Sequence, residues 1–183
     1  MLNNSYFRGL GFSRLTVWLG LAIIISASFM RQVMNFIKAN IGEAGFKTTI
    51  SIILVSAAVF FVIFLLKSRL SLAKYLIFFS ILFLGLFLIW QIEIAEERIH
   101  LFEFAVLGWL ALRDSIKVNK THKAIIVAFT FAFLVGVIDE GFQAILPYRY
   151  FQTWDILLNS LGSFWGVILF LIFKTKKRKK KDF

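Results

Sequence analysis

Six long apolar segments constrain the fold of this chain more strongly than any other feature of its sequence. They cover approximately residues 15–30, 49–66, 72–92, 99–112, 124–146 and 154–173. The hydrophobic content of 60% and the 23 phenylalanines lie far above the usage of soluble domains. In the hydrocarbon core of a bilayer a spanning segment has to satisfy its own backbone hydrogen bonds, which a helix does. The sequence therefore predicts an all-α membrane protein, a bundle of about six transmembrane helices.

The positive charges are distributed unequally between the two sides of these segments. If the N-terminus is cytoplasmic, 16 of the 21 Lys and Arg residues fall on the inner side, and seven of those lie in the last ten residues. Cytoplasmic loops carry an excess of Lys and Arg. We therefore expect both termini in the cytoplasm, with the basic tail of residues 174–183 at anionic lipid headgroups. No basic stripe interleaved with aromatic residues occurs elsewhere, which argues against nucleic-acid binding.

The segment of residues 31–47 is too polar to cross a membrane and too apolar for an ordinary loop. Its apolar residues, among them Phe36 and Ile41, alternate with polar ones such as Lys38. One interpretation is a helix that lies on the outer membrane surface. The other is an extension of the first helix that ends in a turn at Gly42 and Gly45. The complete absence of cysteine excludes disulfides, a thiolate nucleophile and a thiolate metal site.

The acidic residues show the opposite distribution to the basic ones. Eight of the ten fall on the outer side or in the outer parts of the predicted helices. Carboxylates contribute little to topology, so this asymmetry needs another cause. At about 1.5 Å per residue, Asp139 and Glu140 lie roughly 23 Å above the start of their segment, inside the outer leaflet of a core about 30 Å thick.

Polar residues on three predicted helices reach this depth in pairs that share a helix face. The pairs are His100 with Glu103, Asp139 with Gln143, and Asp155 with Asn159. Gly162 and Gly166 continue the last face and permit a close helix contact in lipid. Ionisable side chains in hydrocarbon are costly, so the pattern predicts a functional site.

Several of these residues also have structural interpretations. Asp155 suits a helix N-terminus, and Arg149 suits an anchor at the headgroups or a partner for a carboxylate. His100, Gln143 and Asn159 suit hydrogen bonds between helices. Such roles do not explain why Glu103, Asp139 and Glu140 lie so deep in the membrane. The functional prediction therefore rests on these three residues.

Two motifs in this region resemble the core motifs of the VanZ-like family. They are ERIHLFEF over residues 97–104 and DEGFQ over residues 139–143, and Pro147-Tyr148-Arg149 followed by Asp155, Asn159 and Gly162 matches a third motif. The resemblance covers roughly residues 97–166. Phe104 departs from it, since the family's Glu is followed by Tyr. The resemblance singles out the following positions: His100, Glu103, Asp139, Glu140, Gln143, Arg149, Asp155 and Asn159.

The resemblance implies a multi-pass protein of the bacterial cell membrane, in a family whose founding member is associated with teicoplanin resistance. It implies no particular reaction. We divide the chain into three parts: residues 1–92 with three transmembrane helices and the outer segment, residues 93–173 as the VanZ-like core, and the tail of residues 174–183. The sequence has no evident internal repeat, so nothing in it argues for a further domain.

Three classes of function compete for the acidic residues. The first is an enzyme that acts on a membrane lipid or a lipid-linked envelope precursor, because nearby carboxylates at low dielectric can share a proton and supply an acid and a base. Glu140 is then the general acid and Glu103 the base, Asp139 belongs to the catalytic group, and Arg149 binds a phosphate or carboxylate. Arg149 is expected to bind the substrate together with the other four residues of the motifs: His100, Gln143, Asp155 and Asn159.

The alternatives are a non-catalytic envelope-binding or interaction protein and, with less support, a proton-coupled carrier. A carrier needs polar groups deeper in the bundle, where the last helix offers only Ser160 and Ser163. No cofactor is expected. A divalent ion bridging Glu103, Glu140 and Asp155 is a variant that no zinc-type spacing supports.

Overall fold

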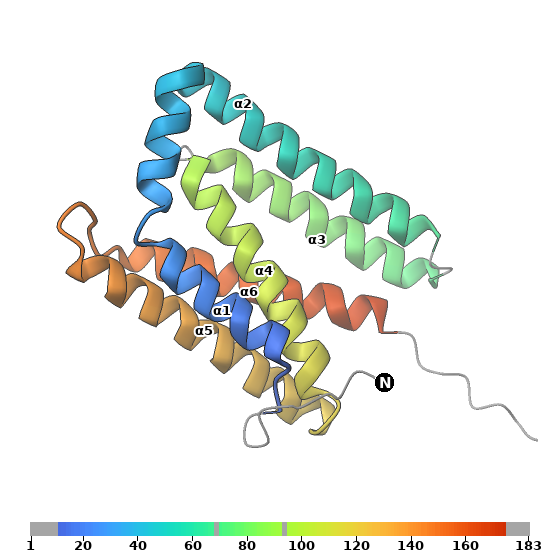
Figure 1. Ribbon diagram of the computed structural model, residues 1–183. Helices are drawn as coiled ribbons and strands as arrows, with labels where there is room; N and C mark the ends of the chain where they lie inside the picture. Colours follow the sequence, from blue (N-terminus) through green and yellow to red (C-terminus); the bar gives the residue numbers. More distant parts are fainter. Residues whose placement is uncertain (1–10, 68–69, 93–94, 175–183) are drawn as a thin grey trace, which may run out of the picture.

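The protein is all-helical in the part described by the computed structural model, which covers residues 11–67, 70–92 and 95–174 (Figure 1). The described chain forms α1 (Arg14–Ser26), α2 (Met30–Leu66), α3 (Leu72–Gln91), α4 (Ala95–Ser115), α5 (Thr121–Ile145) and α6 (Thr153–Phe173). Among the described residues, four segments are long and apolar enough to cross a membrane: Met30–Phe60, α3, α5 and α6. The prediction of an all-α membrane protein is confirmed.

The helix α2 contains a kink at Gly42, where φ is +75°. Such a φ suits glycine because it has no Cβ. Residues 30–41 run across one end of the bundle, and residues 43–66 run back along its length (Figure 1). A new helix begins at Met30 after α1 ends at Ser26, so the interpretation of this region as an extension of the first helix is wrong. Its position at the membrane surface stays a prediction.

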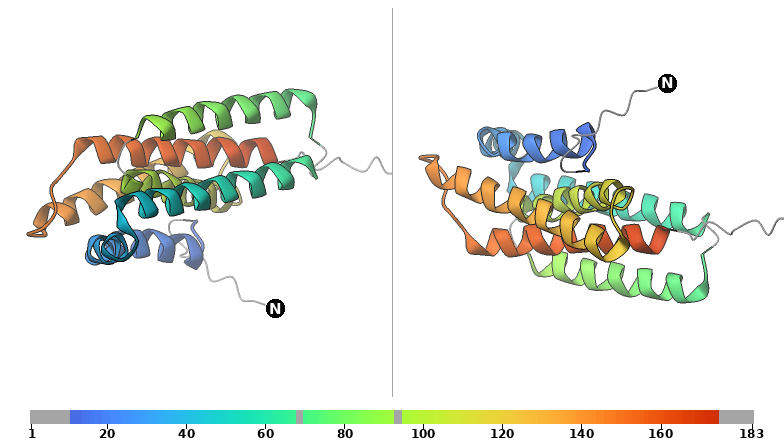
Figure 2. Two further views of the ribbon diagram at one scale, coloured as in Figure 1. Left: turned by 90° about the horizontal axis from the view of Figure 1, so that it is seen from above. Right: turned by 90° about the horizontal axis from the view of Figure 1, so that it is seen from below.

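Successive helices alternate in direction. The α1–α2 turn, the end of α3, the start of α4 and the α5–α6 loop lie at one end of the bundle (Figure 1). The end of α2, the start of α3 and the α4–α5 connection lie at the other end. The helices α4 and α6 occupy the middle, while α1 and α3 lie on opposite outer sides in both views of Figure 2.

The contact between α4 and α6 brings their backbones together through glycines. A Cβ atom added at Gly162 would meet the carbonyl oxygen of Leu101, and one at Gly166 would meet that of Ala105. Gly108 of α4 faces the α6 backbone in the same way. The prediction that Gly162 and Gly166 permit a close helix contact is therefore confirmed. This packing fixes where α6 places its polar residues relative to α4.

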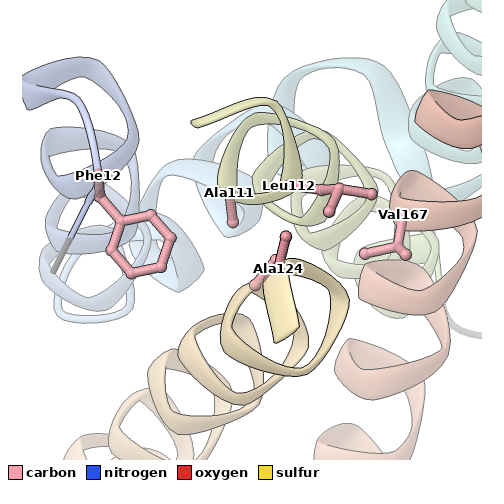
Figure 3. Close-up of a cluster of buried hydrophobic side chains, with 6 residues drawn as sticks. Phe12, Ala111, Leu112, Ala124 and Val167 are labelled. Atoms are coloured by element: carbon pink, nitrogen blue, oxygen red, sulfur yellow. The ribbon is translucent and has the colours of Figure 1, made fainter. Parts of the chain in front are cut away.

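Small side chains also bring α5 against α4 at the end of the bundle away from the α5–α6 loop. Ala111, Leu112 and Ala124 are fully buried there, together with Phe12 ahead of α1 and Val167 of α6 (Figure 3). By contrast, α3 exposes large apolar side chains such as Phe83 and Trp90. Such exposure is expected where the surrounding solvent is lipid.

Candidate functional site

The buried end of α5 holds two carboxylates that are joined by one amide. Asp139, Glu140 and Gln143 are fully buried. Gln143 Nε2 donates to Asp139 Oδ2 and to Glu140 Oε1, both at 3.0 Å. Arg149 Nη2 donates to Gln143 Oε1 from the α5–α6 loop. The Gln143 amide thus uses its donors on the acids and its acceptor on the guanidinium, which fixes the positions of all four groups.

The α5–α6 loop folds back over the end of α5. The helix ends at Ile145, two residues before Pro147, since the residue preceding a proline is disfavoured in helical conformation. The loop returns Arg149 to Gln143, and the backbone N–H of Gln152 donates to Glu140 Oε2 at 3.2 Å. The loop backbone therefore helps to hold the Glu140 carboxylate.

The first two turns of α6 add Asp155 and Asn159 from the facing side. Asp155 is 6% exposed and Asn159 is 1% exposed. Asn159 packs against α5, where a Cβ added at Gly136 would lie 3.3 Å from the Asn159 Cβ. The absence of a side chain at Gly136 therefore makes room for Asn159.

Some buried polar atoms in this region have no hydrogen-bond partner among the described residues. They include Asp139 Oδ1, Asp155 Oδ1 and both side-chain amide atoms of Asn159. Buried polar groups are almost always hydrogen-bonded, so these atoms are well suited to a ligand or water.

A cavity with a mixed polar and apolar lining lies next to this region, at Arg149. Its polar lining comes from His100 and Glu103 of α4 and from Arg149. His100 Nδ1 lies 3.6 Å from Glu103 Oε2, and both side chains are partly exposed. The remaining lining consists of Ser26, Ala27, Met30, Met34 and Ile99. Arg149 belongs to both the cavity and the Gln143 network, so the two are contiguous.

The charges in this region are predominantly negative. Asp139 interacts electrostatically with Glu103 and Asp155. Arg149 supplies an opposing positive charge near Asp139 and Glu140. We call the following eight residues the acidic site: His100, Glu103, Asp139, Glu140, Gln143, Arg149, Asp155 and Asn159.

Comparison with known families places the whole bundle in one group. The model of the VanZ/LLP1 family matches residues 15–174. The chain belongs to the VanZ/LLP1 family. This match is wider than the motifs of residues 97–166, since it includes α1, α2 and α3. Comparison with curated proteins and with solved structures gives no match.

In this VanZ/LLP1 chain, the N-terminal helices contribute to the site in a way that the motifs did not indicate. The cavity takes Met30 and Met34 from the start of α2. Tyr148 Oη donates to the Ser28 carbonyl, and Arg31 Nη1 donates to the Tyr148 carbonyl, both at 2.5 Å. The α1–α2 turn and the α5–α6 loop are thereby joined beside the cavity. Only the spacing of four residues between the two methionines gave a sequence signal, and core packing explains such spacing equally well.

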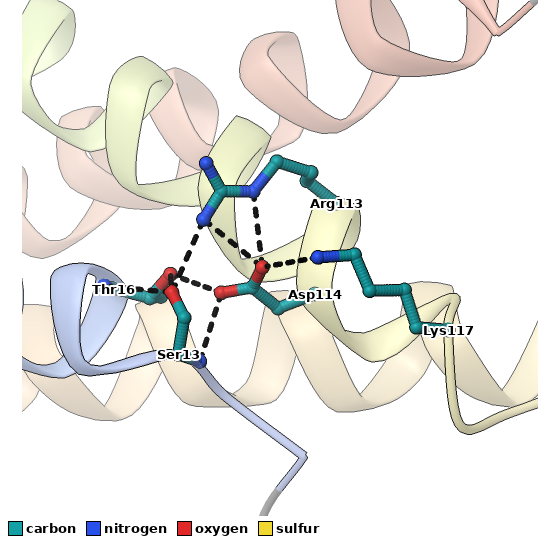
Figure 4. A network of polar contacts seen from close by, with 5 residues as sticks. All are labelled: Ser13, Thr16, Arg113, Asp114 and Lys117. Atoms are coloured by element: carbon teal, nitrogen blue, oxygen red, sulfur yellow. Dashed lines mark hydrogen bonds and ion pairs between the residues drawn. The ribbon is translucent and has the colours of Figure 1, made fainter. Parts of the chain in front are cut away.

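A second polar network in the VanZ/LLP1 chain lies at the other end of α4 (Figure 4). Asp114 is fully buried and accepts from Ser13 N at 2.9 Å, Thr16 Oγ1 at 2.5 Å and Arg113 Nε at 3.0 Å. Lys117 Nζ lies 3.5 Å from its carboxylate. Burial by itself raises the pKa of Asp114, but these hydrogen bonds hold that pKa well below its usual range. The network fastens the start of α1 to α4. Sequence reasoning missed it, because Arg113 and Asp114 read as an ordinary charged loop.

Metal binding was expected only as a variant. Within residues 11–67, 70–92 and 95–174, no three His, Asp or Glu side chains are arranged to share a metal ion. The structure keeps Glu103, Glu140 and Asp155 in one region but not in such a group. The absence of a cofactor stays a prediction.

Proposed function

We propose that this VanZ/LLP1 membrane protein binds an amphipathic molecule of the cell envelope and acts on it through the carboxylates of the acidic site. The observation that carries the proposal is the mixed lining of the cavity. It combines the apolar residues Met30, Met34 and Ile99 with the polar residues Glu103 and Arg149. A molecule with an apolar chain and a polar headgroup matches such a lining. A membrane lipid and a lipid-linked envelope precursor are the two sources of such a molecule.

The roles of the residues follow from their positions. Glu103 borders the cavity and can contact a headgroup, as a general base requires. Glu140 is held by Gln143 and by the Gln152 N–H, and it is our general acid, with Asp139 sharing the Gln143 amide. Arg149 has several N–H donors in a planar fork, which suits a phosphate or carboxylate on the substrate.

The proposal includes an extracytoplasmic acidic site and cytoplasmic termini. The basic residues Lys67, Lys74 and Lys120 lie at the end of the bundle away from the site, as cytoplasmic residues would. The chain has no cysteine, so single cysteines can be labelled without background. In intact cells we expect a membrane-impermeant maleimide to label Tyr150→Cys beside the site, and to label Lys120→Cys only after permeabilisation. The reverse pattern would place the site in the cytoplasmic leaflet.

The catalytic role is tested with an isosteric substitution and a matched control. Glu140→Gln keeps the shape of the side chain but removes its charge, whereas Glu43→Gln makes the same change at a side chain that is 59% exposed. Both variants are expressed at equal membrane levels in a strain that lacks its own copy. Teicoplanin susceptibility and the pools of phospholipids and peptidoglycan precursors are then measured.

If the protein is an enzyme, Glu140→Gln abolishes the phenotype and changes one of these pools, while Glu43→Gln matches the parent. If the protein only binds its ligand, Glu140→Gln abolishes the phenotype and leaves the pools unaltered. If Glu140→Gln behaves as the parent does in every measurement, the carboxylate is structural and the proposal is wrong.

A further inference from the structure

Several buried atoms of the acidic site have no hydrogen-bond partner in the described part of the chain, and the acceptors among them outnumber the donors. We propose that the headgroup it binds carries a primary ammonium group next to a phosphate, as in an aminophospholipid. This inference rests on the proposed function, because it names the ligand class of the same site. It does not depend on whether the bound molecule is chemically altered.

The unpartnered atoms define what a ligand has to offer. Within the described part of the chain, Asp139 Oδ1, Asp155 Oδ1 and Asn159 Oδ1 are buried acceptors, and Asn159 Nδ2 is a buried donor. A primary ammonium has three N–H donors and no acceptor, so it offers one donor for each of the three acceptors. A hydroxyl offers a single donor, and a phosphate offers acceptors. Either group would leave carboxylate oxygens without a hydrogen-bond donor.

The charge balance of the site favours the same group. Asp139, Asp155 and Glu140 interact with one another and with Arg149 as the nearby positive charge. Glu103 at the cavity wall adds a further acid that acts on Asp139. Acids in excess over bases at low dielectric favour a bound cation. The cation is expected in the interior of the bundle, beside the buried carboxylate oxygens that have no partner.

The position of Arg149 accounts for the neighbouring phosphate. Its Nη2 donates to Gln143, and the residue also lines the cavity. A guanidinium carries five N–H donors, so the contact with Gln143 leaves others for phosphate oxygens. The headgroup then lies with its phosphate at the cavity wall and its ammonium towards α5 and α6. Met30 and Met34 offer adaptable apolar surface for the attached glycerol and acyl chains.

Phosphatidylcholine is an informative comparison for this proposal. Its headgroup has the same charges as that of phosphatidylethanolamine, but its quaternary ammonium has no N–H donor. A difference between the two lipids therefore reports hydrogen bonding to the site rather than attraction between charges. Phosphatidylglycerol has the phosphate but no amine, so it reports binding through Arg149 alone.

The experiment uses the purified full-length protein, stripped of lipid in detergent and titrated with each lipid during native mass spectrometry. All three lipids carry identical acyl chains. We expect phosphatidylethanolamine to bind the parent protein at least about tenfold more tightly than phosphatidylcholine. Asp155→Asn and Asn159→Leu should remove this preference, and the surface variant Glu43→Gln should keep it. Circular dichroism checks that each variant is folded, and the comparison of lipids on the parent protein needs no variant.

Each other outcome contradicts the inference in a distinguishable way. Equal binding of phosphatidylethanolamine and phosphatidylcholine overturns the ammonium assignment but leaves an amphiphile site, so the proposed function survives. Tightest binding of phosphatidylglycerol shows that the site selects an anion through Arg149. Failure of every lipid to bind overturns the inference and counts against the membrane-lipid form of the proposed function, leaving the lipid-linked precursor to be tested in the same titration.

Discussion

The close contact between α4 and α6 makes a sharp prediction about a single methyl group. Replacing a helical glycine by alanine normally stabilises a helix by about 1 kcal/mol. At Gly166 the new Cβ would overlap the Ala105 carbonyl oxygen, and it would lie 2.8 Å from the backbone nitrogen of Trp109. These are backbone atoms of α4 rather than the ends of flexible side chains, so relief requires one helix to move.

The magnitude follows from the balance of these two effects. Overpacking of a tight interior costs about 1–3 kcal/mol, and movement of a backbone belongs at the upper end of that range. After the helix-propensity gain is subtracted, we expect Gly166→Ala to lower the free energy of unfolding by about 2 kcal/mol. For a chain of this size that is a decrease in Tm of roughly 4–8 °C.

Gly141 provides the matched control. It is exposed on α5, and among the described residues no atom lies within 4 Å of a Cβ added there. Gly141→Ala should therefore raise Tm by roughly 2–4 °C through helix propensity alone. Thermal unfolding of the purified variants in detergent, followed by circular dichroism, measures both changes. If Gly166→Ala is as stable as Gly141→Ala, the two helices are not in backbone contact and the packing described for α4 and α6 is incorrect.

Two further predictions concern polar contacts at the two ends of the bundle. Because the pKa of Asp114 is lowered by folding, its stabilisation is complete above its unfolded value of about 3.9 and is lost as the pH falls towards the folded value. Asp114→Asn should thus lower the free energy of unfolding by about 2–3 kcal/mol at neutral pH. Unfolding measurements should show this difference shrinking below about pH 4. A difference that persists at low pH would show that the charge of Asp114 is irrelevant. Tyr148→Phe removes the hydrogen bond to the Ser28 carbonyl and should cost about 0.5–1 kcal/mol, with faster amide hydrogen exchange over residues 26–34. Tyr150→Phe, at a side chain that is 77% exposed, should change neither quantity, and an equal effect of both variants would contradict the contact.

The polar pairs show how far local spacing carries a site prediction. Helical periodicity alone places Asp139 and Gln143 on one face, and the structure joins them through a hydrogen bond. The same reasoning applies to Asp155 and Asn159, which are both buried on α6. Such pairs are predictable because the geometry of a helix is fixed by its own backbone.

Contacts between distant segments were beyond this reasoning. The docking of Tyr148 on Ser28 spans 120 residues, and that of Asp114 on Thr16 spans 98 residues. Neither residue pair has a local sequence pattern that distinguishes it from an ordinary charged or aromatic loop. The same holds for Met30 and Met34, whose spacing is equally typical of a packed helix face.

The sequence by itself determined the all-helical membrane fold, the approximate positions of the helices apart from the start of α2, and the grouping of acidic residues on helix faces. These features follow from hydrophobic length and from the regular geometry of a helix, and both act over neighbouring residues. The tertiary structure decided that the Gln143 amide joins two carboxylates to Arg149, that the α1–α2 turn forms a wall of the cavity, and that Asp114 fastens α1 to α4. Those features depend on which helix faces meet, and in this chain the glycine contacts between α4 and α6 set that arrangement.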